Sequence, residues 1–233
     1  MNAIITGATK GIGKAIAMHF AANNYNLVLC ARNLNDLQTL QQELKSKHAG
    51  LDFYIKKTDC SNAEELEMFA DFVQKHFDFT DVLVNNAGLY IPSSLFDEGD
   101  NVLEQQMQTN VYAPGYLCKV FGKQMKNQGK GHIFNICSIA SIKPFVNAAS
   151  YSVTKFALLG LTKVLREELM PYGVNVTAVL PGATLTDSWA GTTLPAERFV
   201  NPDDVASCII NCLNMSAGAN VDEIIIRPLK GEI

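Results

Sequence analysis

Residues Thr6-Gly7-Ala8-Thr9-Lys10-Gly11-Ile12-Gly13 form a glycine-rich turn between a short apolar run and the helical stretch KAIAMHFAA, which starts at Lys14. Glycines in such a turn permit positive φ angles and bring backbone N–H groups close to a phosphate at the start of a helix. The spacing is Gly-x3-Gly-x-Gly, which also fits a plain strand-to-helix turn. Its place between a strand and a helix favours a dinucleotide site.

Short runs rich in Val, Ile and Leu alternate with longer segments of helical period along the chain. The runs are nearly continuous in apolar character, which predicts strands covered by helices on both faces. We therefore expect one α/β domain over 1–233, with a three-layer, doubly wound, seven-stranded parallel sheet of the Rossmann type. The expected strands are 3–6, 27–31, 52–58, 82–85, 132–136, 174–179 and 223–226, and the expected helices are 11–23, 34–47, 62–76, 102–127, 149–170 and 202–213.

The chain has 233 residues, of which 48% are hydrophobic and 18% charged, and its formal net charge is −4. This length and composition predict a single large core and exclude intrinsic disorder. No basic stripe is available for a phosphate backbone, so we expect small-molecule chemistry and no nucleic-acid partner. No signal-peptide pattern and no run of about 18 apolar residues occurs, and we expect a cytoplasmic protein without a membrane partner.

Six cysteines and four histidines are scattered along the chain. The closest cysteine pair, Cys208 and Cys212, lies in an apolar helical stretch, which predicts ordinary buried, reduced thiols. No spacing is typical of a zinc site, so we expect no metal. We expect the histidines to be solvated.

The least regular segment is 183–201, ATLTDSWAGTTLPAERFVN, where Gly, Pro and Thr break any periodicity. It follows a predicted strand end, where open α/β sheets bind ligands, and this predicts a substrate lid. The alternative is an ordinary surface loop. Tyr90, Phe145, Val146 and Trp189 could line an apolar substrate pocket, and packing elsewhere is an equal alternative for each.

The second predicted strand ends in Cys30-Ala31-Arg32, where an NAD-preferring fold usually carries an acidic residue for the adenosine ribose. Arg32 and Lys10 could together flank the 2′-phosphate of NADP, Arg32 as a forked donor and Lys10 as a point charge. A lone exposed base is usually only solvated. Two bases at one site, without the competing acid, favour NADP over NAD.

A second set of polar residues follows a predicted inner strand. Ser138 lies just after that strand, and Tyr151 and Lys155 follow it, four residues apart on one face of a predicted helix. A Tyr-x3-Lys pair also arises by chance in a chain of this composition. The position of the pair is stronger evidence for a functional site than the spacing, because Tyr151 and Lys155 are expected at the same carboxyl edge of the sheet as the glycine turn.

These motifs together resemble the short-chain dehydrogenase/reductase family over essentially the whole chain. Further motifs of that family occur in the expected order. They are Asp59 after the third strand, Asn85-Asn86-Ala87-Gly88 after the fourth, Asn110 in the long middle helix, and Pro181-Gly182 with Thr184 and Thr186 after the sixth.

The resemblance implies an NADP(H)-dependent oxidoreductase that transfers a hydride between the nicotinamide and a carbonyl compound or secondary alcohol. Tyr151 would be the general acid or base, and the ammonium of Lys155 would favour its phenolate and hold the nicotinamide ribose. Ser138 would hydrogen-bond the substrate oxygen, and Asn110 would position water in a proton relay behind Lys155.

The resemblance also assigns contacts with the cofactor. Asp59 and Cys60 would meet the adenine, and Thr184 and Thr186 would meet the nicotinamide carboxamide or the pyrophosphate. The expected cofactor-binding residues are Gly7, Thr9, Lys10, Gly11, Ile12, Gly13, Arg32, Asp59, Cys60, Asn86, Ala87, Gly88, Tyr151, Lys155, Pro181, Gly182, Thr184 and Thr186.

Some of these residues have structural alternatives. Asp59 could cap the next helix, and Asn85 could satisfy backbone groups between strands. Ser141 and Ser152 have no expected role in the site, and we interpret both as structural.

The last residues, VDEIIIRPLKGEI, differ from the glycine-rich closing segment of many family members, such as ketoacyl-carrier-protein reductases. We therefore do not expect this chain to share the substrates of those members, or to form a tetramer through its C-terminal segment as they do. The predicted helices 102–127 and 149–170 still resemble the pair that forms a four-helix dimer interface in this family. We expect a homodimer, with a homotetramer as the alternative.

Two other functions stay open. A sugar-nucleotide epimerase or dehydratase of the extended branch is disfavoured by the chain length and the glycine spacing. A catalytically silent NADP-binding or regulatory protein is disfavoured by the intact Ser138, Tyr151, Lys155 and Asn110, although residues alone do not prove turnover.

Overall fold

A seven-stranded sheet forms the centre of the protein, in a computed structural model that describes residues 1–233. All paired strands are parallel, and their order is β3-β2-β1-β4-β5-β6-β7, as expected for a doubly wound sheet. The strands are β1 (Asn2–Thr6), β2 (Asn26–Ala31), β3 (Phe53–Lys57), β4 (Val82–Asn85), β5 (Gly131–Ile136), β6 (Val174–Pro181) and β7 (Glu223–Ile226). The predicted fold class is therefore confirmed.

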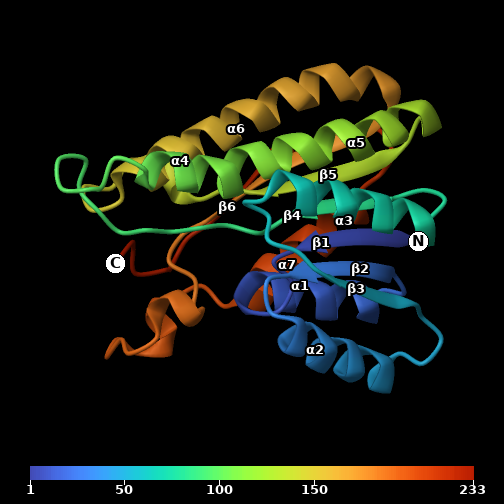
Figure 1. Ribbon diagram of the computed structural model, residues 1–233, viewed down its shortest axis with the longest axis horizontal. Helices are drawn as coiled ribbons and strands as arrows, with labels where there is room; N and C mark the ends of the chain where they lie inside the picture. Colours follow the sequence, from blue (N-terminus) through green and yellow to red (C-terminus); the bar gives the residue numbers. More distant parts are fainter.

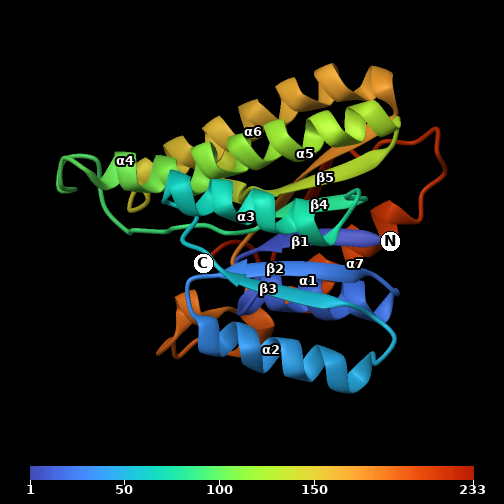
Figure 2. The same cartoon turned by 45° about the vertical axis from the view of Figure 1, so that its right-hand side comes forward.

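Helices cover both faces of this sheet (Figures 1 and 2). One face is covered by α1 (Gly11–Ala22), α2 (Leu34–Lys47) and α7 (Pro202–Leu213), and the other by α3 (Ala63–His76), α5 (Ala113–Gln128) and α6 (Ala149–Leu169). Neighbouring residues of β1 show why the strands are apolar throughout. Ile5 packs into the core beneath α1, α2 and α7, while Ile4 packs into the core beneath α3 and α5.

The order of the strands reverses at β1, which pairs with β2 on one side and β4 on the other. The crossovers that leave these strands turn to opposite faces, so a crevice opens beyond their carboxyl ends. The glycine turn follows β1, and the segment from Asn86 to Gly88 follows β4.

The long middle helix predicted over 102–127 is interrupted, which corrects that prediction. It consists of α4 (Val102–Met107), a π-helical turn η1 (Gln108–Tyr112) and then α5. Pro114 has no N–H for the carbonyl of residue 110, and its ring would clash with that carbonyl in a regular α-helix. The wider π turn relieves this conflict and contains the buried Asn110.

His132 corrects the expectation that all four histidines are solvated. It is buried in β5, where its Nε2 lies 2.7 Å from Thr177 Oγ1 and its ring stacks on Phe134. The Thr177 hydroxyl donates its own hydrogen to the Val221 carbonyl, so Nε2 of His132 is the donor in this pair. Burial lowers the pKa of His132 to about 3. The cysteines are all free, and five of the six are buried. The exception is Cys208, which was expected to be buried like Cys212 and is half-buried.

No helix combines the length and the apolar character that crossing a membrane would require.

Candidate active site

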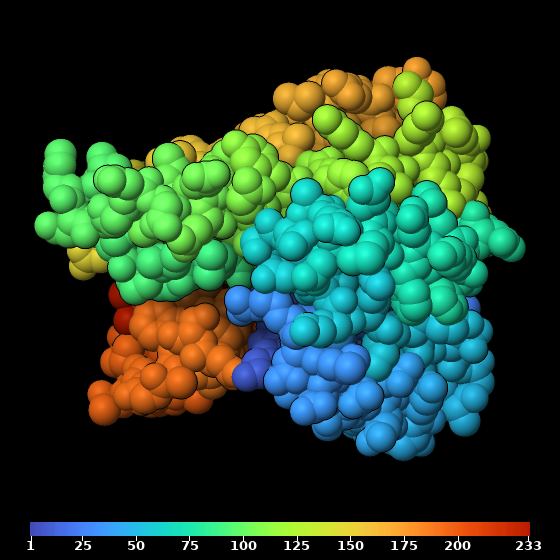
Figure 3. Space-filling view, in the orientation of Figure 1, coloured from blue at the N-terminus to red at the C-terminus, as the bar shows by residue number.

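A cleft of about 1620 Å³ lies at the carboxyl edge of the sheet. Figure 3 shows the hollow between the blue N-terminal residues, the green segment near residue 100 and the orange segment near residue 190. Every expected cofactor-binding residue lines this cleft, and so do Ser138, Tyr151 and Lys155. Asn110 does not line it and lies buried behind its wall.

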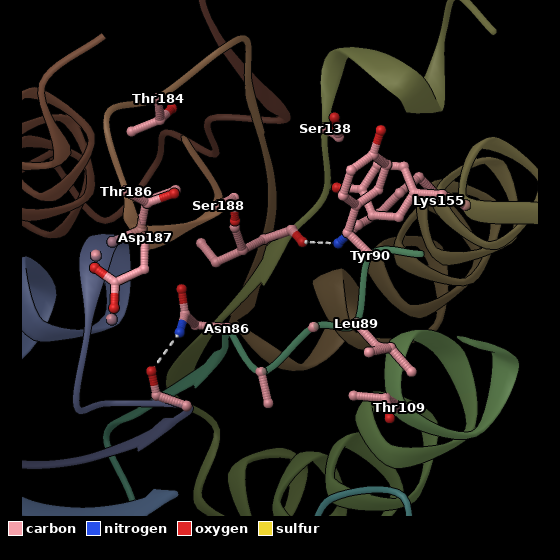
Figure 4. A pocket seen from close by; sticks show the side chains of 18 of the residues that line it. Asn86, Leu89, Tyr90, Thr109, Ser138, Lys155, Thr184, Thr186, Asp187 and Ser188 are labelled. Atoms are coloured by element: carbon pink, nitrogen blue, oxygen red, sulfur yellow. Dashed lines mark hydrogen bonds between the residues drawn. The ribbon is translucent and has the colours of Figure 1, made fainter. Parts of the chain in front are cut away.

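The glycine turn forms a tight cradle at one end of the cleft. Gly7 and Gly11 have positive φ angles of 63° and 49°. A Cβ atom on Gly13 would lie only 2.2 Å from the Gly7 carbonyl oxygen, so this position accepts no side chain without a backbone shift. The amide of Asn86 donates to the carbonyls of Thr6 and Gly7 and ties the turn to the end of β4 (Figure 4).

Helix α1 begins at this cradle without a cap. Asn33, Asn62 and Asn201 cap the starts of α2, α3 and α7 with their side chains, but Lys10 makes no such bond to α1. The first N–H groups of α1 therefore stay available to an anion at the positive end of the helix dipole. Together with the glycine cradle, this arrangement fits the pyrophosphate of a dinucleotide.

Of the two basic side chains expected to flank a 2′-phosphate, one is free and the other is already paired with a carboxylate. Arg32 is exposed at the cleft and makes no ion pair or side-chain hydrogen bond. Lys10 forms an ion pair with Asp187 of the segment 183–201, with 3.0 Å between Nζ and Oδ2. The expectation that Lys10 and Arg32 both face one anion is therefore corrected: Arg32 is free, whereas Lys10 is paired with Asp187. Sequence reasoning missed Asp187, since nothing local signals its approach to the turn.

Asp59 and Cys60 line the cleft, but Asp59 does not cap the next helix. Its Oδ1 accepts hydrogen bonds from the backbone N–H and the hydroxyl of Ser61. The cap of α3 is Asn62, which accepts from the N–H of Glu65. The capping alternative for Asp59 was therefore wrong.

Asn85 has a structural role different from the expected one. Its side-chain amide bridges two strands by donating to Asn135 Oδ1 at 2.8 Å, inside the core. The backbone N–H groups of Asn86 and Ala87 are held instead by the hydroxyl of Thr6.

Lys155 and Tyr151 both project from α6 into the cleft. The buried ammonium of Lys155 donates to the Ile136 carbonyl at 2.8 Å and lies 5.6 Å from the centre of the Tyr151 ring. The Tyr151 ring packs edge-on against Tyr90, with 4.9 Å between ring centres. Figure 4 shows Tyr90, Lys155 and Ser138 on one wall of the cleft, opposite Thr184, Thr186 and Asp187.

Ser138 begins a short turn that follows β5. Its hydroxyl accepts from the N–H of Ala140, and the hydroxyl of Ser141 accepts from the N–H of Ser138. Ser141 therefore holds Ser138 in place, and Ser152 similarly accepts from the N–H of Phe145. Both serines have the structural role that the sequence suggested.

Asn110 is a clamp between two segments. Its Oδ1 accepts from the N–H of Leu89, and its Nδ2 donates to the Leu89 carbonyl and to the Thr154 hydroxyl. The side chain thus joins the end of the β4 loop to α6, one residue before Lys155. Both hydrogens of its amide are engaged in these contacts.

The segment 183–201 folds back on itself beside the cleft. A bridge pairs Thr184 with Val200, and the ring of Trp189 packs edge-on against Phe199, with 5.0 Å between centres. Four residues that the sequence suggested for an apolar pocket all line the cleft: Tyr90, Phe145, Val146 and Trp189.

The cleft also contains residues that sequence reasoning did not identify. Glu104 comes from α4, and Glu232 and Ile233 come from the segment after β7. The distance of the last two along the chain from every motif explains why no pattern pointed to them.

Comparisons with known proteins found similar sequences and similar structures. The family model described as short chain dehydrogenase matches residues 1–195. A sepiapterin reductase from Chlorobaculum tepidum is 31% identical over 238 residues, which cover 99% of this chain and 97% of that protein. An uncharacterized oxidoreductase from Staphylococcus aureus (strain MW2) is 30% identical over 227 residues, covering 97% of this chain and 96% of that protein.

Solved structures match over nearly the full length. An alcohol dehydrogenase from the archaeon Thermococcus sibiricus, complexed with 5-hydroxy-NADP, has 28% identity and a TM-score of 0.91, with 100% of this chain and 98% of that chain covered. L-sorbose reductase from Gluconobacter frateurii, complexed with NADPH and L-sorbose, has 27% identity and a TM-score of 0.89, covering 97% and 94% of the two chains.

Proposed function

The chain belongs to the short-chain dehydrogenase family, and from this premise we propose that it is an NADP(H)-dependent oxidoreductase acting on a carbonyl compound or the corresponding secondary alcohol. One observation carries the proposal. Ser138, Tyr151 and Lys155 line the same cleft as the glycine cradle and the uncapped start of α1. The structures of similar proteins in complex with NADPH and with 5-hydroxy-NADP support the choice of cofactor.

NADPH bound in this cleft would supply the hydride. The positive φ angles of Gly7 and Gly11 shape the turn, the uncapped N–H groups at the start of α1 would meet its pyrophosphate, and Arg32 offers a free guanidinium to a 2′-phosphate. In the reductive direction, the Tyr151 hydroxyl donates a proton to the carbonyl oxygen of the substrate. The Ser138 hydroxyl donates a hydrogen bond to the same oxygen and stabilises its developing negative charge.

Lys155 supports Tyr151 electrostatically. Its ammonium, 5.6 Å from the centre of the Tyr151 ring, stabilises the phenolate that remains after the proton has been donated. The hydrogen bond to the Ile136 carbonyl holds the ammonium beside the ring. Asn110 positions Lys155 from behind, by fastening Thr154 to Leu89.

The segment 183–201 would act as the substrate lid of this single domain. It contributes Thr184, Thr186 and Asp187 to the wall opposite Ser138, and its Trp189 also lines the cleft. It contacts the glycine cradle at two places: Thr186 packs on Gly11, and Asp187 forms an ion pair with Lys10. The ion pair is exposed and therefore weak.

The outer faces of α5 and α6 would form a homodimer interface. Tyr112, Val153, Phe156 and Val164 lie exposed on or beside these helices, which run next to each other in Figures 1 and 2. Exposed apolar side chains in one patch mark an interaction surface. Light scattering of the wild type and of Phe156→Lys tests this, because the variant should be monomeric.

The decisive experiment follows NADPH oxidation with a panel of ketones, aldehydes and quinones. We expect turnover by the wild type and a loss of at least about 100-fold in Tyr151→Phe, because the proton donor is removed. Tyr172→Phe, which changes an exposed tyrosine outside the cleft, is the matched control and should leave the rate unchanged. Equal rates for Tyr151→Phe and the wild type would contradict the mechanism, and tight NADPH binding without turnover would favour the silent cofactor-binding alternative.

A further inference from the structure

The segment after β7 turns back into the cleft. Gly231, with a positive φ of 84°, closes a turn in which its N–H donates to the Pro228 carbonyl. The turn brings Glu232 and Ile233 into the wall of the cleft. In Figure 3 the dark red atoms of this end of the chain lie between the green segment near residue 100 and the orange segment near residue 190.

Glu232 is held in a defined position there. Its Oε1 accepts from Arg227 Nε at 2.7 Å, and its side chain is only 13% exposed. The carboxylate packs on the backbone of Gly182, where a Cβ atom would lie 2.8 Å from Oε2. Any larger residue at position 182 would push the carboxylate away.

The second oxygen of this carboxylate, Oε2, has no hydrogen-bond partner within the protein. This oxygen is not enclosed by the protein, so it can accept a hydrogen bond from water or from a molecule bound in the cleft. Because Glu232 lines the cleft, the partner that fits is a hydrogen-bond donor on a bound molecule.

The sheet register places this acceptor close to the reacting groups. Ile136 pairs with Val179, so Ser138, two residues later, lies level with Pro181 on the neighbouring strand. Adjacent strands are about 4.8 Å apart. Glu232, which packs on Gly182, therefore lies roughly one to two strand spacings from Ser138.

Arg227 is the cation in contact with Glu232, and its Nε is already engaged with Oε1. The lysines and arginines that line the cleft are Lys10, Arg32 and Lys155. Lys10 and Arg32 follow β1 and β2, on the side of the cradle, and Lys155 is engaged with the Ile136 carbonyl. A carboxylate or phosphate on the substrate would bring a second acceptor to Oε2 and no hydrogen for it to accept, so no hydrogen bond would form there.

We propose that Glu232 selects the substrate by accepting a hydrogen bond from a hydroxyl or, better, a primary ammonium group that lies roughly one to two strand spacings from the reacting carbonyl. Compounds with a carboxylate in that place are rejected. This inference rests on the proposed reduction of carbonyl compounds and adds the class of substrate: ketones that carry a hydroxyl or an ammonium group.

Four cyclohexanones with methyl, hydroxyl, ammonium or carboxylate at C4 form a matched series, because the substituent lies across the ring from the carbonyl. We expect kcat/KM of the wild type to be highest for the ammonium compound and lowest for the carboxylate. Glu232→Gln should lower kcat/KM for the ammonium compound about tenfold or more, the effect of one hydrogen bond to a charged group. The methyl compound should change by less than about twofold, since it makes no such bond.

Glu168→Gln is the control for net charge, because Glu168 lies near the end of α6 outside the cleft. It should leave the ranking of the four ketones unchanged. Thermal unfolding of both variants checks that the fold is intact. A wild type that prefers the methyl compound, or a Glu232→Gln variant with an unchanged ranking, overturns the inference while the proposed function stands.

A binding measurement separates this inference from a failure of the proposed function. Calorimetry of 4-aminocyclohexanol with the NADPH-saturated protein needs no turnover. We expect its dissociation constant to rise about tenfold in Glu232→Gln. Absence of turnover with every ketone would count against the proposed function, whereas equal binding to wild type and variant, or no binding to either, would overturn the role of Glu232.

Discussion

The ammonium of Lys155, on α6, donates a hydrogen bond of 2.8 Å to the backbone carbonyl of Ile136, at the end of β5. This bond fastens the helix that carries Tyr151 to the strand that precedes Ser138. It also leaves the lysine beside the Tyr151 ring without a carboxylate to neutralise it.

Replacing this lysine should stop the reaction without unfolding the protein. Lys155→Met keeps the aliphatic stem but removes the charge that stabilises the Tyr151 phenolate, so we expect kcat to fall at least about 100-fold. The measurement is steady-state NADPH oxidation with the best ketone of the panel. Lys163→Met, on the same helix but outside the cleft, is the control and should keep its activity. A Lys155→Met enzyme with normal kcat would remove Lys155 from the mechanism.

Asp187 should weaken the binding of NADPH, because it competes with the 2′-phosphate for Lys10. In Asp187→Asn we expect the dissociation constant of NADPH to fall about two- to fivefold, the range of an exposed ion pair, and that of NADH to stay the same. Trp189 is the only tryptophan and lines the cleft, so its fluorescence reports both titrations.

The matched control for this titration is Asp203→Asn. It removes the same charge from the partner of His19, outside the cleft. The gain in Asp187→Asn should shrink as salt is added, because the ions screen exposed charges. Equal gains for NADPH and NADH would show that the 2′-phosphate is not involved.

Gly13 should tolerate no side chain. In Gly13→Ala the new Cβ would meet the Gly7 carbonyl oxygen at 2.2 Å, and the backbone shift that relieves this contact should cost about 1–3 kcal/mol of unfolding free energy. Urea unfolding measures this cost. Gly50→Ala is the control, because nothing lies within 4 Å of its added Cβ, and its unfolding free energy should change by less than about 0.5 kcal/mol. Similar stabilities for the two variants would contradict the tight packing of the cradle.

His132 should make the protein less stable in mild acid. Its pKa is about 3 in the folded state, because burial disfavours the charged ring, whereas the unfolded chain has the ordinary value of 6.5. Below the unfolded pKa the unfolded state binds the extra proton, so stability is full above pH 6.5 and is lost as the pH falls toward 3. The slope should approach about 1.4 kcal/mol per pH unit.

His132→Gln provides the comparison for this pH dependence. Glutamine can still donate to the Thr177 hydroxyl but does not titrate. The variant should lose the contribution of His132 to the slope, as measured by urea unfolding between pH 4 and 7. An unchanged slope would mean that His132 is protonated in the folded protein.

Local features were predictable from the sequence, because they depend on residues close to one another in the chain. Continuous apolar runs require burial on both faces, as Ile4 and Ile5 show, and this determined the parallel sheet. The glycines of the cradle were identified because only glycine fits a turn of that shape. The four-residue spacing of Tyr151 and Lys155 is enough to place both on one side of α6.

The three-dimensional packing decided which distant groups meet. Lys10 pairs with Asp187, Asn110 clamps Leu89 to Thr154, and Glu232 packs on Gly182, although no motif connects the members of any of these sets. Hydrogen bonds and ion pairs form only within a few ångström. Such distances between remote segments result from the packing of helices on the sheet and from the turn at Gly231, so the charge pattern of the cleft is a property of the folded chain.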